Sequence, residues 1–199
     1  MNQQNATRLE ITLQPKLLEV FLPIFQQGVW VRGVLGCSIR SFLQTYANLS
    51  DAYINQRIQT FFLNHKPVDN IDTALVQDQD ALALSTAMPG VLGAMLRKGG
   101  YYAAMRQSIS QQDRQQSTGA HEGRVRLRLF NFLISEIGPN LLKQGIWIEE
   151  EHLRPCLENI AICFRSQGLD IKVDEEHKKI EELSSIHWAK EVFLKVLEK

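Results

Sequence analysis

The sequence lacks the features by which several classes of protein are recognised. Its three cysteines, Cys37, Cys156 and Cys163, include no CxxC pair. An odd number of cysteines at such spacings is not typical of a disulfide framework or a zinc knuckle, and free thiols favour a reducing compartment. No apolar run reaches the roughly 18 residues of a membrane span, and the polar start, Met1 to Leu9, does not resemble a signal peptide. We therefore expect a cytoplasmic protein without a membrane association.

The chain also lacks an excess of charge and the short motifs of common enzyme families. Lys plus Arg and Asp plus Glu both number 22, so the net charge is zero, which disfavours nucleic acid as a partner. There is no GxSxG, P-loop, GxGxxG or HExxH sequence. Asp69 and Asp72 would need a pocket to act as an acid–base pair. We predict no catalytic residue, no cofactor and no metal, and the sequence leaves open whether the protein is an enzyme.

Hydrophobic patterning predicts a mixed arrangement of strands and helices. Alternation predicts strands at 9–13, 29–31, 58–63, 81–84, 125–130 and 145–148. Helical spacing predicts a helix over 38–47 with Ser38 as its cap, a second over 149–161, and a helical tail over 174–199. The expected core consists of large apolar residues: Trp30, Phe42, Phe61, Leu63, Leu82, Leu84, Leu127, Leu129, Trp147 and Phe193.

Residues 57–90 carry a resemblance to a known family. The segment 57–69 reads as a strand, an Asn, two turn residues, and then Pro-Val-Asp, while 73–84 reads as Thr, x, Leu, a turn with Asp, and a strand. This pattern resembles the late strands of the β-grasp sulfur carriers of molybdopterin and thiamine synthesis. The resemblance implies a ubiquitin-like fold, which serves many roles. Sulfur carriers end in Gly-Gly, whereas Gly99-Gly100 is internal here, so we do not transfer the carrier chemistry.

The expected fold class is α+β, with a β-grasp-like unit over 1–106, a polar linker over 107–123, and an αβ unit over 124–199 that ends in helices. The linker is inferred from a continuous polar stretch. The sequence Gln27 to Val31 (QGVWV) is echoed by Gln144 to Ile148 (QGIWI). This echo indicates either a duplication or two unrelated buried strands that each carry a Trp.

The densest mixture of glycine, cation and aromatic residues follows residue 96. Backbone amides beside glycines, together with cations and rings, can bind a phosphate or a nucleotide. The candidate ligand-binding residues are Arg97, Lys98, Gly99, Gly100, Tyr101 and Arg106. The alternative is a solvated turn above a core contact, in which Gly99-Gly100 reverses the chain before a helix.

Three arginines, Arg124, Arg126 and Arg128, alternate with apolar residues. Strand geometry places them on one face, roughly 7 Å apart, which is close to the phosphate spacing of a nucleic-acid strand. The alternative, which the zero net charge favours, is the charged solvent face of an edge strand.

The sequence offers two further candidate sites, a metal site and a reactive thiol. His152 and Cys156 stand at i and i+4 on an expected helix and could share a metal with Cys163 or His187, although buried cysteines explain the same spacing. Cys37 lies near a helix N-terminus, a position that lowers the pKa of a thiol.

Taken together, these features indicate a non-catalytic β-grasp-type binding or adaptor module that uses a sheet face or edge to hold a protein partner or a second copy of itself. The alternative is an enzyme or a small-ligand protein with a pocket near residues 90–106, between the two expected units.

Overall fold

Strands predicted from alternation are present, and they pair between segments that are far apart in the sequence. The computed structural model describes residues 7–106, 109–111, 119–164 and 169–199. The chain forms two compact units: unit 1 combines Met1–Val29 with Ile137–Lys199, and unit 2 is Trp30–Glu136. The expected linker, 107–123, falls within the range of unit 2, and its positions 107–108 and 112–118 lie outside the described residues.

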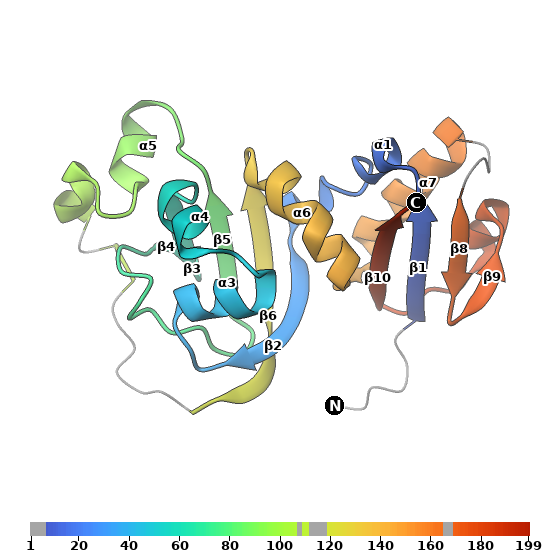
Figure 1. The fold of residues 1–199 in the computed structure, drawn as a ribbon, viewed down its shortest axis with the longest axis horizontal. Helices are drawn as coiled ribbons and strands as arrows, with labels where there is room; N and C mark the ends of the chain where they lie inside the picture. Colours follow the sequence, from blue (N-terminus) through green and yellow to red (C-terminus); the bar gives the residue numbers. More distant parts are fainter. Residues whose placement is uncertain (1–6, 107–108, 112–118, 165–168) are drawn as a thin grey trace. The chain divides into compact units, whose positions relative to one another are not determined.

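Unit 1 is a sheet with helices. Its elements are β1 (Thr7–Leu13), α1 (Pro15–Leu18), α2 (Ile24–Gln27), the end of α6 (Leu133–Gln144), β7 (Ile146–Glu149), α7 (Glu150–Phe164), β8 (Asp170–Val173), β9 (Glu176–Lys178), the 3-10 helix η3 (Ile180–Ser185) and β10 (Glu191–Glu198). The strands lie in the order β7-β10-β1-β8-β9. The first and last strands, β1 and β10, run parallel at its centre, where Leu9 is level with Leu194 (Figure 1).

Unit 2 is likewise a sheet with helices. Its elements are β2 (Val29–Leu35), α3 (Ile39–Ala47), α4 (Asp51–Gln56), β3 (Thr60–Leu63), β4 (Lys66–Pro67), β5 (Ala81–Ser85), α5 (Gly90–Leu96), the 3-10 helix η2 (Tyr101–Arg106) and β6 (His121–Phe130). The strands lie in the order β4-β3-β5-β6-β2. The helices α3 and α4 lie over one face of this sheet (Figure 1).

Apolar rows across the sheet of unit 2 form its core. Leu63, Leu82 and Leu127 are level on β3, β5 and β6, and each is at most 1% exposed. Helix α3 begins as the sequence predicts, because the Ser38 hydroxyl accepts a hydrogen bond from Ser41 N at 3.2 Å. Its buried Phe42 belongs to the same core.

Two sequence predictions about the tail and the core are wrong in part. The tail expected to be helical over 174–199 contains the strands β9 and β10 with the 3-10 helix η3 between them, and in β10 the residues Val192, Leu194 and Val196 alternate inward. Seven of the ten expected core residues are buried, but Phe193 and the tryptophans Trp30 and Trp147 are half-buried on the opposite faces of their strands.

The chain repeats one order of elements. Strand, helix, strand, helix, hairpin and strand occur from β1 to β5 and again from β6 to β10. Gly28 and Gly145 precede the two Trp strands with φ of 106° and 97°, and both hairpins turn through two residues of positive φ. In each unit, the first strand of one half joins the later strands of the other half. This agreement favours a duplication over two unrelated Trp-bearing strands.

Among the described residues, no helix is long and apolar enough to cross a bilayer.

The unit boundaries can be tested with two fragments. We expect residues 30–136 to unfold cooperatively in urea, because they contain every strand of the unit 2 sheet. Residues 1–106 should show no cooperative transition by circular dichroism, because they lack β6 and its buried Val125, Leu127 and Leu129. A cooperative transition in 1–106 but not in 30–136 would contradict these boundaries.

Candidate functional site

Arg106 is the structural anchor of the predicted ligand-binding segment. Its side chain is 1% exposed and pairs with Asp69, the distance from Nη2 to Oδ1 being 2.6 Å. Its Nε donates to Met95 O at 2.6 Å, and its Nη1 donates to Ser110 Oγ at 3.0 Å. Because the guanidinium is occupied by partners within the protein, Arg106 holds α5, η2 and the start of the following segment together.

The Gly-Gly turn is tied to the same carboxylate. Gly99 has a φ of 58°, and its N–H donates to Asp69 Oδ1 at 3.2 Å. Lys98 Nζ donates to Ile54 O at 3.1 Å and lies 4.9 Å from the centroid of the Phe61 ring. Burial, followed by the charge of Arg40, lowers the pKa of the Lys98 ammonium. The turn precedes the helix η2, as the chain-reversal interpretation predicts.

The remaining predicted residues lie at the surface. Arg97 Nε donates to Gln59 Oε1 at 2.8 Å, and Arg97 O accepts from Gly100 N at 3.2 Å. Tyr101 is 89% exposed and meets Tyr102 edge to face, with the ring centroids 5.2 Å apart. The structure therefore gathers all six predicted residues into one segment but assigns Lys98, Gly99 and Arg106 to internal bonds.

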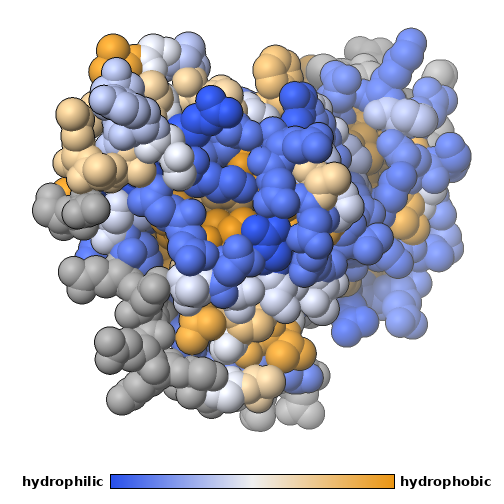
Figure 2. Space-filling view, turned by 60° about the vertical axis from the view of Figure 1, so that its left-hand side comes forward, coloured by the Kyte–Doolittle hydropathy of each residue, from blue (hydrophilic) through white to orange (hydrophobic). Residues whose placement is uncertain are grey.

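This segment carries an exposed apolar surface. Six of the nine strongly exposed large apolar side chains among the described residues lie on it: Val91, Leu92, Tyr101, Tyr102, Met105 and Ile109. We call these six residues the α5–η2 surface. Figure 2 brings this end of unit 2 forward, and white to orange residues gather on it beside a largely blue face. An apolar patch of this kind marks a contact surface more often than a solvated turn.

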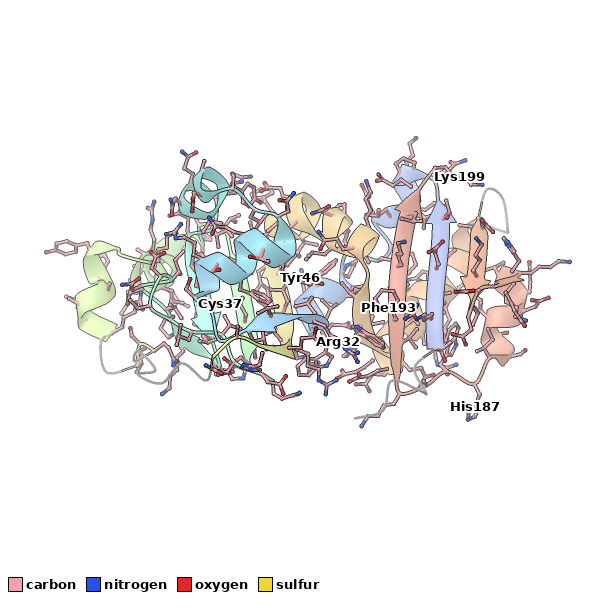
Figure 3. All side chains as sticks on the ribbon, turned by 60° about the horizontal axis from the view of Figure 1, so that its bottom comes forward. Arg32, Cys37, Tyr46, His187, Phe193 and Lys199 are labelled. Carbon is pink, nitrogen blue, oxygen red and sulfur yellow. The ribbon has the colours of Figure 1, made fainter. Side chains whose placement is uncertain are left out.

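A second surface lies on the sheet of unit 2, on the face away from α3. Arg124 and Arg126 lie over the Trp30 ring, 4.4 and 5.8 Å from its centroid. Arg128, Ala83 and Phe62 are level on β6, β5 and β3. All of these side chains except Arg124 border a hollow of about 470 Å³. Figure 3 shows Arg32 on the side of β2 that is away from α3, the helix that carries Tyr46. We call this side of the unit 2 sheet, with Trp30, Phe62, Arg124, Arg126, Arg128 and Phe130, the arginine face.

The acidic residues beside His152 and the cysteines do not form one site in the structure. Side chains of Glu149, Glu151 and His152 lie within 4.8 Å of one another. Cys156 is not part of this group: its thiol donates to His152 O at 3.7 Å, and burial raises its pKa to about 11, which disfavours a thiolate ligand. The side chain of Cys163 lies outside the described residues. Cys37 is half-buried, and its thiol donates to Val34 O at 3.6 Å.

The two carboxylates considered as an acid–base pair have separate partners. Asp69 binds Arg106, whereas Asp72 binds Arg40, and this hydrogen bond lowers the pKa of the Asp72 carboxyl. Both therefore serve to attach loops of unit 2 to neighbouring segments.

Comparisons with models of known protein families, with curated proteins and with solved structures found no match.

Sequence reasoning identified the arginines of the arginine face but missed its aromatic members. Trp30 is among the expected core residues, whereas in the structure it is half-buried on the face opposite to Val29 and Val31. The signal that could have found it is the alternation of β2 itself: Val29 and Val31 are buried, so Trp30 must face the other way.

Replacing Asp69 tests the role of Arg106. D69N should lower the free energy of unfolding by about 1–3 kcal/mol, because it leaves a buried guanidinium without its charged partner. It should also speed hydrogen exchange of amides in 91–105, measured by mass spectrometry. The matched control is D51N, whose carboxylate is 63% exposed and pairs with Arg40. Its cost should stay below about 1 kcal/mol. Equal effects from both variants would contradict an anchoring role.

Proposed function

We propose that the protein is a non-catalytic binding module that holds a protein partner in the cytoplasm. The observation that carries this proposal is the clustering of exposed apolar side chains on the α5–η2 surface. Val91, Tyr101 and Met105 are 74%, 89% and 72% exposed. Burying them against a partner removes apolar area from water, at roughly 25 cal/mol per Å².

The packing beneath this surface supports a binding role. Gly93 lies so close to Met88 that an added Cβ would come within 1.9 Å of the Met88 carbonyl oxygen. Arg106 closes the other end of the segment through Met95 O and Asp69. A surface that is held in place before binding loses less conformational entropy on association.

The residue types on this surface favour a protein as its partner. Tyrosine and methionine are enriched at protein interfaces, and charged groups are depleted at the centres of such interfaces. The cations of this segment donate to acceptors within the protein: Arg97 to Gln59, Lys98 to Ile54 O and Arg106 to Asp69. A second copy of the chain remains one form that this partner could take.

The second candidate function is small-ligand binding or catalysis in a hollow of about 500 Å³ next to this segment. Polar groups of Thr86, Asn131 and Ser135 lie beside Pro89 and the ring of Phe132 in its lining. This hollow lies within unit 2 and does not involve Arg97 or Arg106, so it differs from the pocket that the sequence suggested.

Site-specific cross-linking tests the proposed function. A photoreactive benzoylphenylalanine at Tyr101, in cells that express the full chain, should give a discrete cross-linked product. The product should fall at least fivefold when Val91 and Met105 are both replaced by Ser, because the apolar contact is lost. Ile162 on α7, which is 76% exposed, is the matched position elsewhere on the protein.

Mass spectrometry of the product distinguishes a different protein from a second copy of the chain. Products that are the same from positions 101 and 162, or that are unaffected by the double serine variant, would contradict docking at the α5–η2 surface.

A further inference from the structure

The arginine face combines cations and aromatic rings on an accessible side of a sheet. Along β6, Val125, Leu127 and Leu129 are at most 1% exposed, while the residues between them are half-buried and border solvent. Arg124, Arg126, Arg128 and Phe130 therefore share one face of this strand. Trp30 joins them from β2, since Arg124 and Arg126 both lie over its ring.

Small residues open a hollow between these groups. The pairing of β3, β5 and β6 sets Phe62, Ala83 and Arg128 level with one another, and Ala81 level with Arg126. Because an alanine side chain ends at Cβ, the space above β5 is left between the ring of Phe62 and the two guanidinium groups. His65 and Gln79 complete the rim of this hollow of about 470 Å³.

Two residues that line the hollow have donors without a partner. Trp30 Nε1 and Arg128 Nε are both buried without a hydrogen-bond partner in the part of the chain that the structure describes. Buried polar groups nearly always have partners, and exceptions call for an explanation such as a bound ligand.

Two neighbouring carboxylates accept hydrogen bonds from donors within unit 2. Asp78 Oδ1 accepts from Arg124 N at 2.8 Å, and Asp80 accepts from Gln77 N and from Asn64 Nδ2. Asp80 is 5% exposed. The corresponding sheet face of unit 1 differs, because there Glu10 pairs with Lys195. The unit 1 face mixes Arg8, Lys172 and Lys195 with Glu10 and Glu175. Among the described residues, the lining of the hollow in unit 2 contains Arg126 and Arg128 and no carboxylate, within a chain of zero net charge.

We propose that the arginine face binds single-stranded nucleic acid. Arginines two residues apart on β6 lie roughly 7 Å apart, which suits successive phosphates of an extended strand. Phe62 and Phe130 offer rings on which bases stack, a contact that every base can make, while the Trp30 ring holds Arg124 and Arg126 in place. A row of several cations matches a strand better than it matches one nucleotide.

Fluorescence anisotropy of a labelled 12-nucleotide oligouridine, at 50 to 200 mM KCl, tests this inference. The full chain should bind, and its affinity should fall as salt is raised. R126Q/R128Q should weaken binding about tenfold or more at 100 mM KCl and reduce the salt slope by about 1.4, because each lost phosphate contact removes about 0.7. F62L, which changes no charge, should weaken binding by roughly tenfold through lost stacking.

The matched control is R8Q/K172Q, which removes the same charge from the sheet face of unit 1, where Arg8 likewise lies over an aromatic ring. Its affinity should stay within twofold of the unchanged protein, and thermal unfolding checks that all variants fold. A parallel oligothymidine shows whether the ribose hydroxyl contributes.

Four results would each overturn the proposal: no binding at 50 mM KCl, equal loss in both double variants, equal binding of a duplex or of uridine monophosphate, or displacement by polyglutamate of equal charge.

Discussion

The register of β6 against β5 is the constraint on which unit 2 depends. It sets Leu127 and Leu129 level with Leu82 and Leu84, and all four are buried beneath the helices of that unit. A shift of one residue would exchange the faces and bury the arginines, so burial of the leucines fixes the register. The same register that forms the core therefore places Arg126 and Arg128 on the accessible face, next to the alanines that open the hollow.

The two proposed surfaces differ in chemistry, one apolar and the other cationic and aromatic, and they lie on different elements of unit 2. The α5–η2 surface is apolar and is held by Arg106, a cation that serves an internal structural purpose. On the arginine face, the cations stack on Trp30 or border the hollow. Lys98 shows how the surfaces are kept apart: it contacts Phe61, whose neighbour Phe62 points to the other side of the sheet. Each surface can thus be altered by substitution without changing the other.

Local patterns in the sequence predict local structure well in this chain. The Ser38 cap, the turn at Gly99-Gly100 and the alternation of β6 depend on neighbouring residues, and all three are present. The identity of β10 depended on more distant partners. Residues 186–196 fit both a helical and a strand period, and pairing with β1 and β7 decides for the strand. Composition also could not reveal the unit boundaries, because β6 follows the polar stretch and yet pairs with β5, which precedes it.

The candidate site was predictable in its members but not in their roles. Residues 97–106 are gathered as expected, yet the contact of Arg106 with Asp69 joins positions 37 residues apart and has no local signal. The position of Trp30 follows from the alternation of β2: hydrophobicity alone indicates burial, but burial of Val29 and Val31 places the ring on the opposite face.

The most direct test of the account is a nitrogen-15 nuclear magnetic resonance titration of the full chain with the 12-nucleotide oligouridine. If the arginine face binds the strand, the Trp30 indole resonance and the amides of β5 and β6 should shift together, while the amides of residues 91–105 and the indole of Trp147 stay in place. Shifts confined to residues 91–105, or equal shifts of Trp30 and Trp147, would contradict the assignment of separate surfaces to unit 2.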